Sequence, residues 1–321
     1  MTAGQIIRNA GAGLIALLLA ACTDGAAPVE PVLKPLARPD AAASASPPVQ
    51  VARPTSEASA QLRSYLNQVQ GAQLSQGLLR RDGGGSDTPF TNTMLARNFE
   101  QIALYNEYDS SFSGRGGASP LRRWTAPVRM EVIFGDSIPP SERATDSANI
   151  RAYAERLERV TNHPVSIAKR PNFIVIIADE DDRAEALAQA AARLPGISAA
   201  SLAPLNNLRD DTYCVVAAYA SGQGSNVYTA ALAVIRAENP SLLRLSCIHE
   251  ELAQGMGLAN DSPSARPSIF NDDDEFALLT RHDELLLQML YDPRLSPGMT
   301  ADEARDTIQT IAAELTGGGP V

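Results

Sequence analysis

The sequence predicts an α+β fold, because strands and helices alternate through the middle of the chain and a run of helices follows. Apolar runs rich in β-branched residues at 128–134, 172–177 and 227–235 are typical of strands. Helical spacing of apolar residues separates these runs and then continues to about residue 315. These observations place an α+β domain at residues 121–321.

The composition is that of an ordinary globular protein and excludes several classes of function. Hydrophobic residues make up 44% and charged residues 20% of the 321 residues. The 37 acidic residues outnumber the 27 Lys and Arg residues, which gives a formal net charge of -10. Such a chain gains nothing from the release of phosphate counterions, so we do not expect nucleic acid as a partner. Three Cys residues cannot form a zinc site of four thiolates, and no closely spaced Cys pair begins a site of two Cys and two His.

The first residues of the chain have the pattern of an export signal. Arg8 is their one charged side chain, and the apolar run at 13–21 is shorter than the roughly 20 residues that span a bilayer. The run ends in Leu19-Ala20-Ala21-Cys22, which resembles the bacterial lipobox. This resemblance implies that residues 1–22 are a lipoprotein signal peptide and that Cys22 carries the acyl chains that bind the membrane. The alternative is an ordinary signal peptide in which Cys22 has no role.

Thr23 follows the lipidated position, where by the same resemblance an Asp would favour retention in the inner membrane. We therefore expect the protein at the periplasmic face of the outer membrane, with the inner membrane as the less favoured location. In this oxidising compartment Cys214 and Cys247 are expected to form a disulfide. The alternative is a pair of buried free thiols.

Two further segments precede the α+β domain. Residues 23–55 are rich in Ala, Pro and Ser and predict a disordered tether. Residues 56–120 predict a small helical segment, since apolar residues recur at helical spacing at 55–79 and again at 91–108.

Within the α+β domain, turn and cap residues separate the predicted elements. Pro195-Gly196 ends an Ala-rich helix, Gly222 and Gly224 form a turn between two strands, and Asn239-Pro240 opens the next helix. In chain order, the predicted elements are a strand at 128–134, a helix at 147–160, a strand at 172–177, a helix at 183–194, strands at 213–219 and 227–235, and helices at 240–257, 279–291 and 301–315.

The helix predicted at 240–257 carries the residues that bear most directly on function. His249-Glu250 suggests the motif H-E-x-x-H, in which two His one helical turn apart hold zinc and the Glu activates water. The second His position is Ala253, which offers no ligand atom, so this register fails.

One residue further along, the run from Glu250 to Asn260 resembles the metzincin motif H-E-x-x-H-x-x-G-x-x-H without a gap. The resemblance implies that Glu250, Gln254 and Asn260 stand at the metal-ligand positions. It also implies that Glu251 stands at the position of the catalytic glutamate. Gly257 matches the glycine at which the chain reverses to bring the third ligand round.

Other segments extend this resemblance. Ser268-Ile269-Phe270 stand where metzincins have a Met-containing turn below the metal, and residues 279–283 and 287–291 resemble the closing helix of matrixin-type proteases. Upstream, Trp124 precedes a strand, a helix, further strands and the motif helix in an order similar to that of zincins. The resemblance covers about residues 121–292. It implies a zincin-like, metzincin-type mixed sheet with a motif helix and C-terminal helices.

The sequence is also similar to a proteobacterial family of lipoproteins known only as a domain of unknown function. Three segments carry this similarity: Glu250 to Gln254, Gly257 to Asp261 and Pro267 to Phe270. That family implies no established activity.

The substitutions in the motif change its chemistry, because one carboxylate and two amides replace three imidazoles, and amide oxygens are weak zinc ligands. We therefore expect no cofactor, the alternative being zinc or calcium. The sequence favours a non-catalytic binding or scaffold module for a peptide or an envelope protein. The alternative is an atypical metal-assisted hydrolase of peptide or cell-wall material, with Glu251 as general base. In that case Glu250, Gln254 and Asn260 or Asp261 would bind the metal or the substrate.

The remaining candidate residues favour structural roles. We expect His249 to be solvated or satisfied in the core rather than to bind metal from an adjacent helix face. His282 is expected to cap or pack near the closing helix, and His163 to lie in a helix-to-strand connection. The acidic run 272–275 lacks the ligand spacing and central Gly of a calcium loop, so a solvated acidic turn is expected.

Overall fold

The computed structural model describes residues 55–107, 116–194, 196–197, 199–222, 225–271 and 273–318. All of the described residues belong to one compact unit. The predicted signal peptide with Cys22, and all of the predicted tether except Thr55, lie outside the described residues, as does Asp272 of the acidic run. Of the helices that the structure describes, none is both long and apolar enough to cross a membrane.

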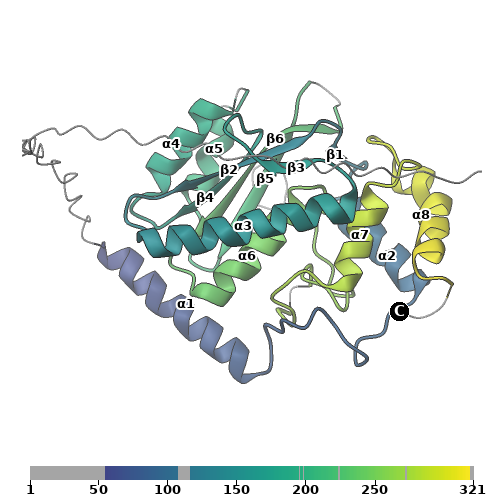
Figure 1. Cartoon of the computed structure of the whole chain (residues 1–321), viewed down its shortest axis with the longest axis horizontal. Coiled ribbons are helices and arrows are strands. Elements are labelled where there is room, and N and C mark those ends of the chain that lie inside the picture. Colours follow the sequence, from purple (N-terminus) through teal and green to yellow (C-terminus); the bar gives the residue numbers. More distant parts are fainter. Residues whose placement is uncertain are drawn as a thin grey trace, which may run out of the picture. The chain divides into compact units, whose positions relative to one another are not determined.

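A six-stranded sheet forms the centre of this unit (Figure 1). Its strands are β1 (Arg123–Trp124), β2 (Val128–Phe134), β3 (Val165–Ile167), β4 (Phe173–Ala178), β5 (Cys214–Ala220) and β6 (Val227–Arg236). β4 lies between β2 and β6 and runs parallel to both, and β3 pairs in parallel with β2. β1 also pairs in parallel with β6, whereas β5 pairs with β6 in the antiparallel direction. The fold is therefore mixed α/β with a mostly parallel sheet.

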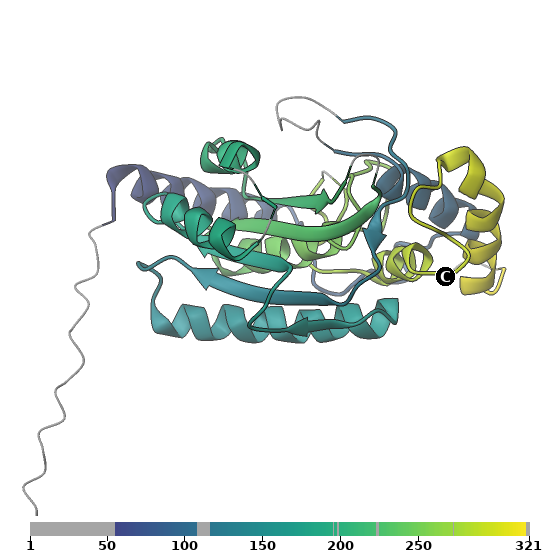
Figure 2. The same ribbon diagram turned by 90° about the horizontal axis from the view of Figure 1, so that it is seen from above.

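Helices cover both faces of the sheet (Figure 2). The helices α3 (Pro140–Thr161) and α6 (Ser241–Gln254) pack on one face, and α4 (Arg183–Arg193) and α5 (Ala199–Asn206) pack on the other. Every residue of β4 is buried, as expected for a central parallel strand with helices on both sides. Its side chains alternate between the two cores, which places α6 directly against the sheet.

Three more helices extend the core of the α6 face beyond the sheet. They are α2 (Asn92–Ala103), α7 (Arg281–Leu290) and α8 (Ala301–Leu315). Their apolar side chains, such as Phe99 and Ile308, join the same buried cluster as Ile248 of α6. α2 and α7 thereby lie at the carboxyl-terminal end of the motif helix.

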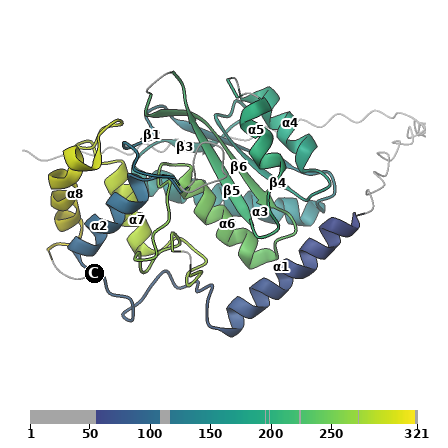
Figure 3. The ribbon, with the colours of Figure 1, turned by 180° about the vertical axis from the view of Figure 1, so that it is seen from behind.

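The remaining helix, α1 (Glu57–Ser75), packs along the amino-terminal part of α6 (Figure 3). Leu62 and Leu66 form a small buried cluster with Leu243 of α6. The side-chain oxygen of Gln70 accepts a hydrogen bond of 3.0 Å from the Leu243 amide, one of the donors that the first turn of a helix leaves without an intrahelical partner. Both helices from the predicted segment 56–120 thus pack on the rest of the unit.

The structure differs from the predicted elements where they are short or begin with proline. α3 begins at Pro140 rather than at residue 147, because proline suits the first position of a helix. The sequence analysis did not predict the three-residue strand β3 or the helix α5, which contains Pro204. α6 ends at Gln254 rather than at residue 257, because the chain leaves the helix at Gly255.

Candidate functional site

The carboxyl-terminal end of α6 is fixed against the sheet by two close contacts. The indole Nε1 of Trp124 donates a 2.8 Å hydrogen bond to the Gly255 carbonyl oxygen. A Cβ at residue 255 would lie 2.5 Å from the Phe173 ring, so only glycine allows the helix to approach β4 this closely. These contacts determine where the last turn of α6, with its polar side chains, is placed.

The chain reverses at Gly257, as the motif comparison predicts. Gly257 has a φ of 128°, and its amide donates a 2.8 Å hydrogen bond to the Gln254 carbonyl oxygen. A Cβ here would lie 2.4 Å from the Arg122 carbonyl oxygen. Both the backbone conformation and the closeness of the Arg122 backbone therefore require glycine. The reversal carries residues 258–261 back beside α6.

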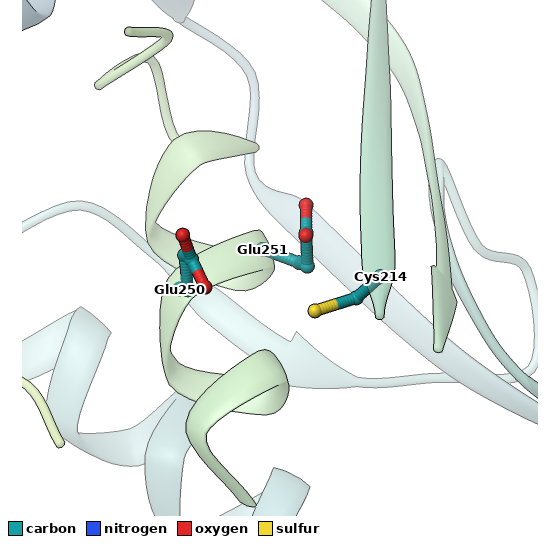
Figure 4. Close-up of side chains that lie close together, drawn as sticks. All are labelled: Cys214, Glu250 and Glu251. Atoms are coloured by element: carbon teal, nitrogen blue, oxygen red, sulfur yellow. The ribbon is translucent and has the colours of Figure 1, made fainter. Parts of the chain in front are cut away.

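Two adjacent glutamates of α6 approach the start of β5 (Figure 4). One carboxylate oxygen from Glu250, one from Glu251 and the Sγ of Cys214 all lie within 4.8 Å of one another. Glu251 is only 4% exposed, and its Oε2 is buried without a hydrogen-bond partner. Glu250 is partly buried. Neither glutamate forms an ion pair in the part of the chain that the structure describes.

Burial and neighbouring carboxylates oppose ionisation of both groups. The pKa of Glu250 is raised well above its usual value by burial first, and then by the charges of Asp261, Glu251 and Glu107. Burial, Glu107 and Asp261 likewise raise the pKa of Glu251. Glu250 and Glu251 are therefore two adjacent carboxyl groups whose negative charge the fold opposes.

The structure brings Gln254 to Asp261 rather than to Asn260. The Gln254 Nε2 donates a 3.2 Å hydrogen bond to Asp261 Oδ1. The Asn260 Nδ2 instead donates a 2.8 Å hydrogen bond to the Gln101 carbonyl oxygen on α2. Asp261 therefore lies on the Gln254 side of the site, whereas the amide nitrogen of Asn260 is used to hold the returning chain against α2.

A disulfide joins Cys214, the first residue of β5, to Cys247 of α6. It links the antiparallel edge strand to the motif helix one turn before the two glutamates. The Asn239 Nδ2 lies 3.6 Å from the Cys247 Sγ. In this oxidised state the Cys214 sulfur carries no negative charge and is not a thiolate ligand.

All three histidines of the chain bond elsewhere. The His249 Nδ1 accepts a 3.0 Å hydrogen bond from the Leu279 amide, and its ring stacks on Tyr153 with 4.1 Å between the centroids. Burial lowers the pKa of His249 to about 3, so its imidazole is neutral. His282 is fully buried beside Asn98, and the His163 Nε2 lies 3.0 Å from the Ala126 carbonyl oxygen. No imidazole is therefore held at the two glutamates.

The turn at Ser268-Ile269-Phe270 is fixed by Asp283, which is fully buried at the start of α7. The Ser268 hydroxyl and the Ile269 amide donate hydrogen bonds of 2.5 and 3.1 Å to the Asp283 carboxylate. Thr280 and Asp283 form a capping box with each other. The signal for this cap was present in the sequence, as Thr280 precedes Asp283 by three residues before an apolar run.

Glu107 belongs to the acidic site but was not predicted from the sequence. Its amide donates a 3.0 Å hydrogen bond to the Ala259 carbonyl oxygen, which joins the end of the α2 segment to the chain after Gly257. No local pattern around Glu107 indicates this position, because the contact joins residues that are far apart in the chain.

Comparison with known proteins identifies the family. A family model described as a protein of unknown function, DUF2927, matches residues 92–310. The chain belongs to the DUF2927 family. The match runs from the start of α2 into α8 and contains all of the residues of the acidic site. No curated protein and no solved structure matches this DUF2927 chain.

The donor set of the DUF2927 site does not fit the zinc of metzincins. That ion is held by three imidazoles, whereas these positions hold a carboxylate and two amides here. One amide donates to Asp261 and the other to α2. The groups that do converge are acidic oxygens and one sulfur, a different ligand chemistry.

The reversal at Gly257 can be tested with Gly257→Ala. The added methyl meets the Arg122 backbone and the residue must keep a positive φ, so we expect a loss of at least about 3 kcal/mol in the free energy of unfolding, measured by urea denaturation. Gly77→Ala is the matched control, since Gly77 also has a positive φ but has no atom within 4 Å of the position that a Cβ would take. It should lose only about 1 kcal/mol. Equal losses in the two variants would contradict the steric role of Gly257.

The poorly compensated charge can be tested with Glu250→Gln. The Glu250 carboxyl has a raised pKa in the folded state, so it ionises at a lower pH in the unfolded chain than in the folded protein. Ionisation therefore favours the unfolded chain, and the free energy of unfolding falls as the pH rises above 4.5. The gain in unfolding free energy of Glu250→Gln over the parent should therefore grow from about pH 5 to about pH 8. Glu158→Gln, on the exposed side of α3, is the control and should follow the parent. A gain that does not change with pH would show that the fold compensates the Glu250 charge.

Proposed function

We propose that this chain is a lipid-anchored envelope protein whose domain has a metzincin-like scaffold and binds an extended peptide segment without cleaving it. The lipid anchor rests on the lipobox resemblance at Cys22. The location at the periplasmic face of the outer membrane rests on Thr23, the residue after the lipidated Cys. The peptide-binding role rests on the geometry of α6 and β5.

Several features support the metzincin-like scaffold. The order of strand, helix, strands and motif helix is that of the zincins that the sequence resembles. The motif helix ends in a reversal at Gly257, which is the step that the motif glycine performs in metzincins. A fixed turn at residues 268–270 and a helix at the predicted closing position follow it.

The observation that carries the non-catalytic role is the hydrogen bond between Gln254 and Asp261. It places an amide paired with a carboxylate where a metzincin has a metal-binding imidazole. The three histidines bond elsewhere in the fold, so no nitrogen ligand replaces it. In the disulfide form these positions lack the ligands that would hold a Lewis acid, so nothing lowers the pKa of water, which is a poor nucleophile.

The edge strand β5 offers a surface for an extended peptide. β5 pairs with β6 on one side, and among the described strands no other pairs with it. Backbone groups on such an edge can pair with a further strand, which is a frequent mode of peptide recognition. Cys214 lies at the start of β5 and beside Glu250 and Glu251, so a peptide on this edge would pass the acidic site, where Glu250, the more exposed of the two glutamates, would favour a basic side chain.

One observation favours a second function, that of an atypical hydrolase of peptide or cell-wall material. The Glu251 Oε2 is buried without a partner, and burial raises the pKa of this group. Raised carboxyl pKa values in a buried site are typical of general acids and bases. In this function Glu251 would accept a proton from a water molecule held beside it.

Glu251→Gln in the full chain distinguishes the two functions. Peptides selected from a displayed library for binding to the parent should bind the variant with an affinity within about threefold, since a neutral side chain of the same shape is retained. They should remain intact by mass spectrometry after incubation with either protein. Hydrogen exchange should slow at β5 amides when peptide is bound. Cleavage by the parent that the variant lacks would contradict the binding role and support the hydrolase.

Cys22→Ser tests the lipid anchor. In a proteobacterial host fed with labelled palmitate, the parent should carry the label and sediment with the outer membrane, because acyl chains provide its membrane affinity. The variant should carry no label. Thr23→Asp is the companion variant, which should keep the label and shift towards the inner membrane. A parent without label would refute the lipobox assignment.

A further inference from the structure

Three ligand atoms from two separate elements converge beside the disulfide (Figure 4). The Cys214 Sγ comes from β5, and one oxygen each comes from Glu250 and Glu251 of α6. All three lie within 4.8 Å of one another. This set keeps Glu250 of the motif's ligand positions, but it uses Cys214 and Glu251 in place of Gln254 and Asn260.

The oxidised sulfur does not complete this set, but the reduced sulfur does. A dithiol reductant gives two electrons and two protons to the Cys214–Cys247 disulfide, which yields two thiols and the oxidised reductant. A metal ion then displaces the proton of the Cys214 thiol, which is released to solvent. One thiolate and two carboxylates from adjacent elements remain, which is the donor set of a three-coordinate protein site.

We propose that the dithiol form of this protein binds one zinc ion through Cys214, Glu250 and Glu251, and that disulfide formation and zinc binding exclude each other. The site leaves a fourth zinc position for water. The proposal concerns metal binding alone and does not depend on the proposed peptide binding.

Burial and charge at the glutamates support the site independently of their spacing. Glu251 is 4% exposed, and its Oε2 is buried with no hydrogen-bond partner. Figure 4 shows that this side chain reaches from α6 towards β5, where Cys214 lies. A buried acceptor of this kind costs free energy unless a donor or a cation meets it. A divalent ion meets both glutamates at once.

The chemistry of the ligands selects the ion. Zinc binds thiolate sulfur at about 2.3 Å and carboxylate oxygen at about 2.0 to 2.2 Å. Three ligand atoms around one zinc ion therefore lie within the 4.8 Å that separates the Cys214 sulfur and the two glutamate oxygens. Calcium and magnesium prefer oxygen ligands and gain little from a thiolate. The sulfur therefore favours zinc, whereas the two carboxylates alone would favour calcium.

Two single substitutions test the proposal, because each removes the disulfide but leaves a different sulfur. The metal-free full chain is titrated with zinc against a chromogenic chelator. Cys247→Ser keeps the Cys214 thiol and should bind one zinc with or without a phosphine reductant. Cys214→Ser keeps the Cys247 thiol, which is outside the three-atom cluster, and should bind more than about tenfold more weakly. The parent should bind zinc only after reduction.

Further variants assign the oxygen ligands. In the Cys247→Ser background, Glu250→Gln and Glu251→Gln should each weaken zinc binding by more than about tenfold. The loss of a residue that only supports a metal ligand costs roughly 10- to 100-fold in affinity, so the loss of a ligand itself should exceed the lower bound of that range. Glu238→Gln is the matched control, because Glu238 is a fully buried glutamate that contacts Ser59 and lies outside the cluster. Its zinc affinity should be unchanged. Millimolar calcium should not displace the zinc.

A second readout keeps the test decisive if a Cys variant does not fold. Cobalt in place of zinc should give a thiolate charge-transfer absorption in the reduced parent, and zinc should slow alkylation of Cys214 by a maleimide. Equal zinc binding by the two Cys variants, or tight binding by the oxidised parent, would overturn the proposal. Either result would leave the peptide-binding role untouched, since no peptide is present in the assay.

Discussion

The close approach of the end of α6 to the sheet sets the geometry of the whole site. Gly255 lies against the Phe173 ring and Gly257 against the Arg122 backbone, at distances that no side chain would allow. The Trp124 indole holds the same end by a hydrogen bond to the Gly255 carbonyl. With this end fixed, the last turn of α6 presents its acidic side chains to β5. The reversal at Gly257 then brings Asp261 back beside Gln254.

The site formed in this way is costly for the fold. Two adjacent glutamates are held where burial and nearby acidic groups oppose their charge, and no Lys or Arg pairs with them among the described residues. The Cys214–Cys247 disulfide offsets part of this cost. A disulfide between residues 33 positions apart contributes about 3 to 4 kcal/mol by restricting the unfolded chain.

His249 illustrates how a sequence pattern can mislead by one residue. It stands next to Glu250 in the chain, yet its ring packs on Tyr153 and accepts a hydrogen bond from Leu279. Successive residues of a helix are separated by about 100°, so neighbours in sequence point to different faces. The zinc motif therefore fails in both registers, once because a ligand is missing and once because a carboxylate and two amides replace the three imidazoles. In its place the fold brings two adjacent glutamates beside the Cys214–Cys247 disulfide.

Local patterns in the chain were enough to predict part of this protein. The apolar run of β4 and the helix α7 both follow from residues within one or two turns of each other. Cys214 and Cys247 were paired from the compartment and their number, and the structure joins them. Long-range packing had to be seen before three other features could be known: Asp261 meets Gln254, Glu107 joins the acidic site, and β5 is an antiparallel edge strand with Cys214 beside two glutamates. These contacts link residues from distant parts of the chain, or depend on which way a side chain turns after a reversal. Periodicity carries no information about either.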